Sequence, residues 1–184
     1  MRLFTGIPVP ESAAHELERL RGGMHGARWV EPAAYHITLS FIGEADRALA
    51  EAIITALAGV RAAPFSLRLA GIGSFGRQRP RAVWAGVEDS AALERLQVRQ
   101  ASVLAALGIK LEKRKFRPHV TLARLKSGSG REAGRFIERH NLFHGVRFDV
   151  DEFLLYSSRP SRGGGPYAVE AGFPLDGLAG TKSS

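Results

Sequence analysis

Short apolar runs alternate with longer amphipathic stretches along the chain, a pattern typical of a protein that combines β-strands with α-helices. Short or alternating apolar runs predict strands at residues 2–7, 28–30, 35–42, 65–72, 82–87, 119–123, 146–156 and 167–173. Apolar residues at helical spacing predict helices at residues 11–20, 45–57, 91–107 and 131–140. Because the elements repeat in two similar rounds, the order predicts an α+β fold of two similar lobes rather than a parallel doubly wound sheet.

Two of the predicted strands carry the same short motif, a histidine followed two positions later by a threonine. The motifs are His36-Ile37-Thr38 and His119-Val120-Thr121. Residues i and i+2 of a strand point to the same face, so each histidine lies beside its own threonine. One such motif is weak evidence and is typical of a half-buried strand. Two motifs in matching apolar contexts favour a shared cleft that contains both imidazoles.

Two imidazoles suit acid–base chemistry on a phosphodiester. One takes a proton from the attacking nucleophile, and the other gives a proton to the leaving oxygen. With an ordinary pKa of about 6.5, one histidine can be neutral and the other cationic near neutral pH. The hydroxyls of Thr38 and Thr121 can donate hydrogen bonds to the non-bridging oxygens. The residues around the two motifs are too alike to show which histidine is the base.

The composition predicts one globular domain without metal or other cofactor. Hydrophobic residues make up 45% of the 184 residues, and there is no cysteine for a disulfide or a thiolate site. Neither motif strand contains a carboxylate, so a metal site at the two histidines would need ligands from elsewhere. No apolar run resembles a signal peptide or a membrane span. We expect a domain at residues 1–176, a flexible tail at 177–184, and a cytoplasmic monomer without membrane attachment.

Positive charge is concentrated around the second motif. The net charge is +8, and residues 110–131 contain eight Lys or Arg and one acidic residue. A second cluster, Arg77, Arg79 and Arg81, lies in a predicted loop. A charge run is often only a solvated face, and the alternative is an anionic partner, first of all a nucleic acid or nucleotide.

The segment at residues 71–76 matches G-x-G-x-x-G, the pattern of dinucleotide-binding loops. That fingerprint must open a helix directly after a strand. Here it leads into the arginine cluster and then another strand, so we interpret it as a glycine-rich loop.

Residues 35–43 and 117–124 resemble the two signatures of the two-histidine (2H) phosphoesterases. They resemble in particular the bacterial and archaeal RNA 2′,3′-cyclic phosphodiesterases, once described as 2′-5′ RNA ligases. The opening strand that ends in Pro8-Val9-Pro10, the strand at 83–87 and the strand at 153–158 fit the same branch. The resemblance extends to about Leu175.

The resemblance implies a bilobal α+β fold, with two pseudo-twofold-related antiparallel-sheet lobes, helices packed outside and a central cleft. It implies metal-independent hydrolysis of RNA or nucleotide 2′,3′-cyclic phosphate ends to a 2′-phosphate. It also implies His36 as the proton donor and His119 as the proton acceptor. Ligation or cleavage of 2′-5′ linkages by the same site is an alternative, and so is a module that binds RNA ends without turnover.

Further residues are candidates for substrate binding. Arg124 lies five positions after His119, so strict alternation would point it away from the cleft unless the strand bulges. Phe4 and Phe41 could stack on a base, although apolar strand residues more often belong to the core. Arg81 and Arg117 could contact the phosphates of an RNA partner.

Overall fold

The computed structural model describes residues 1–76, 79–112, 114–127, 129–158 and 167–177. Within these ranges every strand pairing is antiparallel. The strands are β1 (Arg2–Pro8), β2 (Arg28–Trp29), β3 (His36–Glu44), β4 (Phe65–Ser74), β5 (Ala82–Val87), β6 (His119–Arg124), β7 (His144–Val150), β8 (Glu152–Ser158) and β9 (Tyr167–Pro174). The helices are α1 (Glu11–Glu18), α2 (Arg47–Ala58), α3 (Ala91–Ala106) and α4 (Gly130–His140), with a 3₁₀ turn at Pro32–Ala34.

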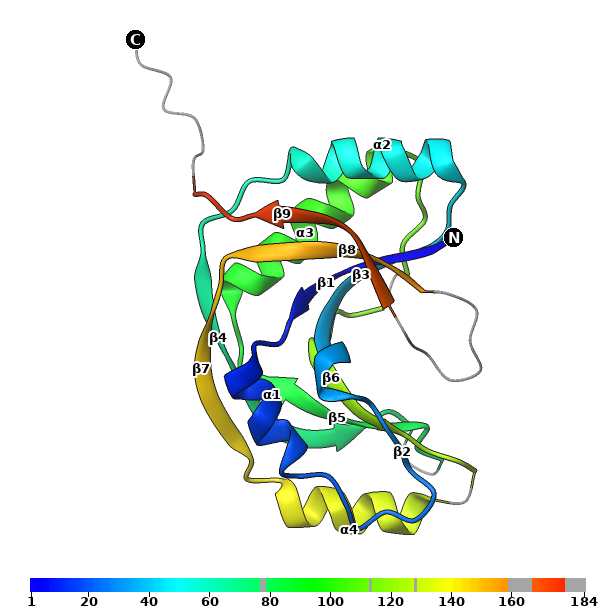
Figure 1. Ribbon diagram of the computed structural model, residues 1–184, viewed down its shortest axis with the longest axis vertical. Coiled ribbons are helices and arrows are strands. Elements are labelled where there is room, and N and C mark those ends of the chain that lie inside the picture. Colours follow the sequence, from blue (N-terminus) through cyan, green and yellow to red (C-terminus); the bar gives the residue numbers. More distant parts are fainter. Residues whose placement is uncertain (77–78, 113, 128, 159–166, 178–184) are drawn as a thin grey trace.

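The strands form one curled sheet with an approximate twofold at its centre (Figure 1). The order is β7-β4-β5-β6-β3-β1-β8-β9, and β2 pairs with β6 off this path. We name the two sides after their motif strands. The β3 half contains β3, β1, β8 and β9, and the β6 half contains β6, β5, β4 and β7. The two motif strands are therefore neighbours at the centre, although they lie far apart in the sequence.

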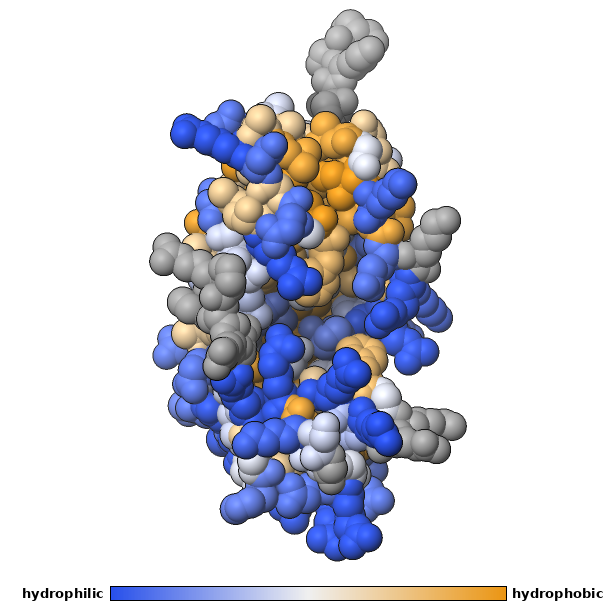
Figure 2. All heavy atoms as spheres, turned by 90° about the vertical axis from the view of Figure 1, so that its right-hand side faces the viewer, coloured by the Kyte–Doolittle hydropathy of each residue, from blue (hydrophilic) through white to orange (hydrophobic). Residues whose placement is uncertain are grey.

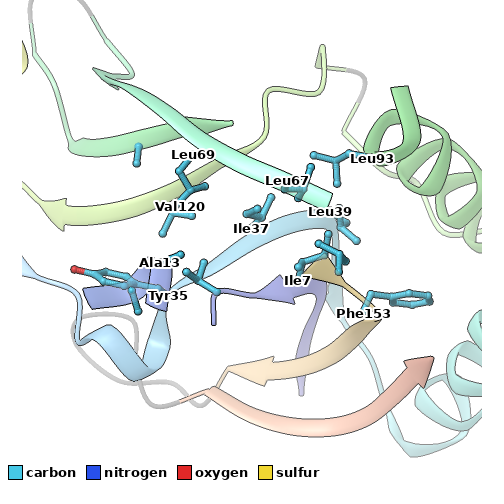
Figure 3. Close-up of a cluster of buried hydrophobic side chains, with 14 of the residues drawn as sticks. Ile7, Ala13, Tyr35, Ile37, Leu39, Leu67, Leu69, Leu93, Val120 and Phe153 are labelled. Atoms are coloured by element: carbon cyan, nitrogen blue, oxygen red, sulfur yellow. The ribbon is translucent and has the colours of Figure 1, made fainter. Parts of the chain in front are cut away.

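Each half is covered by two helices, one of which follows a strand of the other half. Helices α2 and α3 contact each other and the strands β9 and β3, while α1 and α4 contact β7 and β4 (Figure 1). The buried hydroxyl of Thr5 on β1 donates to Gln100 Oε1 of α3 over 2.6 Å. Apolar side chains from both halves form a continuous core between sheet and helices (Figure 3). The expected α+β class with two antiparallel lobes is confirmed.

The helices lie where the amphipathic pattern predicts them, within a few residues at each end. Two of them begin at capping side chains, which accept a hydrogen bond from a backbone N–H of the first turn. Asp46 accepts from the N–H of Leu49, and Ser90 accepts from that of Leu93. Local chemistry thus determines where α2 and α3 begin.

The single strand predicted at residues 146–156 is wrong. This segment forms two strands, β7 and β8, which separate at Asp151 and belong to opposite halves. Strand β7 pairs with β4, whereas β8 pairs with β1 and β9. The apolar alternation continues through the junction, so only the partners of each strand reveal the break. The strand predicted at residues 35–42 also ends two residues early, since β3 continues to Glu44.

Some predictions fall outside the described residues. These are part of the arginine loop at 77–78, Lys113 within the basic segment, and the tail from residue 178 onward. Residues 159–166 also lie outside, within the segment 158–166, whose Pro, Gly and Arg residues predict a hairpin loop.

Candidate active site

The two motifs open the two central strands, and the residues after them have matching environments. His36 is the first residue of β3, and His119 is the first residue of β6. On each strand the histidine and threonine are partly exposed, and the residue between them is buried. The two residues after the threonine are buried, and the sixth is exposed. The pseudo-twofold of the sheet thus extends to single side chains.

The two motif strands pair through Ile37 and Val120, which are both fully buried. Figure 3 shows these two side chains within the core. Because side chains alternate along a strand, the histidines and threonines flanking this pair lie on the opposite face of the sheet. The structure therefore brings His36, Thr38, His119 and Thr121 together on one face.

The same backbone contact holds both imidazoles. Nδ1 of His36 lies 2.8 Å from the carbonyl oxygen of Ala34, and Nδ1 of His119 lies 2.8 Å from that of Arg117. A carbonyl only accepts, so each Nδ1 carries a hydrogen and donates it. The neutral form of each ring then has its lone pair on Nε2, which is the atom available to take or give a proton.

Burial is the main influence on both histidines and lowers the pKa of each, because the imidazolium loses hydration. The hydrogen bond to the Ala34 or Arg117 carbonyl favours the charged ring and opposes this shift. Positive charge on His119 and Arg124 lowers the pKa of His36 further. The two imidazoles and Arg124 therefore share one electrostatic environment, in which a bound anion would favour protonation.

A bulge in β6 turns Arg124 to the face that carries the four motif residues, which we call the cleft face. Ala82 and Trp84 of β5 lie two residues apart, and their partners on β6 are Arg124 and Thr121, three residues apart. The extra residue shifts the alternation of β6 by one position. Ala82 and Trp84 share a face, so Arg124 shares the face of Thr121. This is the irregularity that strict alternation required for Arg124 to reach the site.

The same irregularity occurs in β3 and directs Phe41 to the cleft face. Phe4 and Gly6 of β1 pair with Phe41 and Thr38, so β3 also contains one extra residue. Phe41 is 58% exposed and presents an open ring. Phe4 is only 3% exposed, and its ring centroid lies 5.0 Å from that of His36. Phe4 therefore packs beside His36 and offers no open face to a base.

Four aromatic rings that the sequence did not single out surround the two imidazoles. They are Tyr156 and Tyr167, with ring centroids 5.6 and 5.1 Å from that of His36, and Phe75 and Trp84, at 4.8 and 5.9 Å from that of His119. In the sequence these residues are indistinguishable from core aromatics of ordinary strands. Burial raises the pKa of Tyr156 to about 12, which keeps this hydroxyl neutral beside His36.

The glycine-rich segment at 71–76 makes room for one of these four aromatic rings. The segment opens no helix, as the sequence interpretation required, but the predicted loop is wrong for residues 71–74, which are the end of β4. A Cβ on Gly73 would collide with the indole ring of Trp84. Gly73 therefore lets Trp84 lie against β4, next to His119.

A cavity of about 470 Å³ extends from the motifs toward the basic segment. Residues from both halves line it, including Thr38, Ser40, Phe41, Phe75, Gln97 and His119, together with residues 111–112 and 114–117. His36, Thr121 and Arg124 lie outside this lining. Seen from the right-hand side of Figure 1, the molecular face has a hollow near its middle, with an apolar region above and a hydrophilic region below (Figure 2).

The two remaining predicted arginines lie near opposite ends of β6. Arg117 lines the cavity just before the strand begins. The Arg81 carbonyl accepts from the N–H of Leu125 over 2.8 Å, just after the strand ends. Both side chains are exposed. The structure thus places them on either side of the motif rather than together.

Comparison with known proteins identifies the family. A family model described as the 2′-5′ RNA ligase superfamily matches residues 8–162. The chain belongs to this superfamily of 2H phosphoesterases, which is a family of enzymes. The expectation from the two motifs is therefore confirmed.

Relatives within the superfamily match most of the chain. A Geobacillus stearothermophilus protein named RNA 2′,3′-cyclic phosphodiesterase is 35% identical over 184 residues, covering 95% of this chain and 57% of that protein. A Thermotoga maritima protein of the same name is 35% identical over 176 residues, 92% of each chain. A crystal structure of a Thermus thermophilus protein matches with a TM-score of 0.80 and 26% identity, covering 96% of this chain and 99% of that one. This chain therefore spans little more than half of the Geobacillus relative.

Within the residues that the structure describes, two further findings concern membrane-spanning helices and clusters of metal-binding side chains. None of the helices in these residues has both the length and the apolar character needed to cross a membrane. No three side chains of the His, Cys, Asp and Glu types gather there in an arrangement that could hold a metal ion.

Proposed function

We propose that this protein hydrolyses the 2′,3′-cyclic phosphate at the end of an RNA chain, or of a nucleotide, to a 2′-phosphate. The observation that carries the proposal is the pair of imidazoles on one face of the sheet, each with Nδ1 bound to a carbonyl and Nε2 free of that contact. Such a pair supplies both proton transfers of a displacement at phosphorus. The activity named for the Geobacillus and Thermotoga relatives agrees with this chemistry.

In the proposed reaction, Nε2 of His119 takes a proton from a water molecule. The water oxygen bonds to phosphorus while the bond from phosphorus to the ribose 3′-oxygen breaks. Protonated His36 gives its Nε2 proton to the departing 3′-oxygen, which leaves a 3′-hydroxyl and a 2′-phosphate. Positive charge on Arg124 lowers the pKa of His36 and makes its imidazolium a stronger proton donor, which supports this assignment of roles.

The other motif residues would stabilise charge and position the nucleotide. Hydroxyls of Thr38 and Thr121 would donate to the non-bridging oxygens, and the Arg124 guanidinium would add a charged hydrogen bond. The exposed ring of Phe41 would stack on the terminal base. No step requires a metal ion, because the two histidines perform both proton transfers.

The experiment is incubation with a short RNA that ends in a 2′,3′-cyclic phosphate, with and without EDTA. We expect a 2′-phosphate end and the same rate in both samples. A 3′-phosphate product, or loss of activity on chelation with recovery on adding a divalent ion, would contradict the mechanism. Joining to an added 5′-hydroxyl RNA would reveal ligation, which by microscopic reversibility the same site can perform. Binding without turnover would identify an RNA-end-binding module.

A further inference from the structure

A two-residue strand joins β6 where β3 leaves it. Among the described residues, β3 and β6 pair only through Ile37 and Val120, and beyond this pair β2 takes the place of β3 beside β6. In β2, Arg28 lies opposite Arg124, and Trp29 lies opposite Ala123. Within the same described ranges, β3 has no equivalent extra strand, since it pairs only with β1 and β6. Strand β2 thus breaks the pseudo-twofold beside the active site.

The register determines where the side chain of Arg28 points. Trp29 faces inward and packs on Phe136 of α4, with a ring-centroid distance of 5.6 Å. Successive residues of a strand face opposite ways, so Arg28 faces outward and is exposed. Directly opposed residues of an antiparallel pair share a face, with Cβ atoms about 5 Å apart. Arg28 therefore lies beside Arg124 on the face that carries the motif residues.

The backbone that flanks β2 is held on both sides of the strand. The N–H of Val30 donates to the carbonyl of Leu122 over 2.8 Å, and the N–H of His25 donates to Glu132 Oε2 over 3.0 Å. Together with the packing of Trp29, these contacts keep the strand against β6. The arginine side chain therefore starts from a fixed position at the edge of the cleft.

Arg28 and Arg124 are two guanidinium groups in directly opposed positions, so one anionic chain can contact both. Lys126 continues the positive charge beyond Arg124, in the basic segment of the chain. At the equivalent position of the other half, β3 presents the aromatic Phe41. At this one position the β3 half presents an aromatic ring suited to a base, and the β6 half presents two arginines suited to a phosphate chain.

We propose that Arg28 binds the phosphate on the 5′ side of the terminal nucleotide while Arg124 engages the cyclic phosphate, so that the site selects RNA chain ends over cyclic mononucleotides. The proposal rests on the proposed function. It assigns a direction to the substrate: the terminal base lies toward Phe41, and the preceding chain leaves over β2. A nucleoside 2′,3′-cyclic phosphate therefore needs only one added phosphate, on its 5′-oxygen, to contact Arg28.

The test compares adenosine 2′,3′-cyclic phosphate with its 5′-phosphorylated form and with a dinucleotide that has the same cyclic end. For Arg28→Ala we expect kcat/KM to fall about tenfold on the two substrates with a 5′ phosphate, as the loss of a charged hydrogen bond predicts. On adenosine 2′,3′-cyclic phosphate without a 5′ phosphate, we expect kcat/KM to change by less than about twofold. The slope of log kcat/KM against log salt should decrease by about 0.7 for the dinucleotide.

Arg28→Lys keeps the charge and should retain most of that salt slope. Arg47→Ala is the matched control, since Arg47 is an exposed arginine of α2 paired with Glu51. Thermal unfolding of each variant tests whether β2 remains attached. Equal losses on all three substrates, or no loss on any, would overturn the role of Arg28. If the wild type hydrolyses none of them, the proposed function falls and this proposal falls with it.

Discussion

In the β3 half, the motif strand runs from Thr38 through a bulge to the exposed ring of Phe41. In the β6 half, the same bulge leads from Thr121 to Arg124, which a second arginine flanks on β2. Before this position, the histidine, the threonine and the burial pattern are repeated, and so is the carbonyl contact of each imidazole.

The comparison separates two requirements of the site. Displacement at phosphorus needs one proton-transfer group on each side of the atom, and a twofold repeat supplies two such groups in equivalent positions. A nucleotide has unlike ends, a flat base and an anionic chain, so the positions that orient it must differ. The halves are alike where the proposed proton transfers require it, and unlike where the proposed nucleotide substrate is asymmetric.

The largest expected effect tests the two histidines, which are repeated in both halves. His36→Ala and His119→Ala should each lower kcat on a cyclic mononucleotide by about 10² to 10⁴, because each removes one of two distinct proton transfers. Circular dichroism should show both variants folded, since the motif side chains face the cleft. Near-wild-type turnover of either variant would mean that the two histidines are not separate participants.

The next largest effect tests Arg124, which lies where the two halves differ. Arg124→Gln should lower kcat/KM about ten- to a hundredfold, because a charged hydrogen bond to the phosphate is lost. Its removal also takes away a positive charge that lowers the pKa of His36, so that pKa should rise. If His36 is the acid, the alkaline limb of the pH–kcat/KM profile moves to higher pH.

If the acid limb of the pH–kcat/KM profile of Arg124→Gln moves instead, His36 is the base and His119 is the acid. Arg117→Gln is the control, because only the backbone carbonyl of Arg117 contacts His119. Both limbs of that variant should stay in place.

A smaller effect compares the two threonines. Thr38→Ala and Thr121→Ala should each reduce kcat about tenfold, since a neutral donor contributes less than a proton carrier. Thr→Ser at either position keeps the hydroxyl and should restore most of the rate. A loss as large as that of the histidine variants would give the threonines more than a hydrogen-bonding role.

The smallest effect concerns stability. Burial lowers the pKa of His36 and His119 in the folded protein below the unfolded value of about 6.5. The unfolded chain therefore binds more protons between the folded pKa values and about 6.5, and stability falls as the pH falls through that window. Thermal unfolding measured from about pH 7.5 to 5 should show a decreasing midpoint.

In the double variant His36→Asn, His119→Asn, this decrease should be weaker. It should not vanish, because burial also lowers the pKa of His140. An identical decrease in the double variant would show that the cleft histidines do not carry the effect.

Several features could be predicted from the sequence because they depend on neighbouring residues. Helical spacing of apolar residues located the helices to within a few residues at each end. The strand period of two places each motif histidine beside its threonine. The repetition of the motif indicated a two-lobed enzyme, and the family comparison confirms it.

Other features depend on partners that lie far away in the chain. A bulge is a mismatch between two strands, so the turn of Arg124 toward the cleft is decided by pairing with β5. The division of residues 146–156 at Asp151 follows from the different partners of β7 and β8. The position of Arg28 beside Arg124 also exists only in the register of β2 with β6.

By itself, the sequence determined the two histidine–threonine pairs that we propose carry the chemistry, because residue type and strand period are local properties. Tertiary structure alone decided how these residues are oriented and surrounded: the common face of the two motifs, the aromatic walls of the imidazoles, and the arginine side of the cleft. The physical reason is that hydrogen bonds between strands and burial arise from contacts between distant segments, which no local pattern encodes.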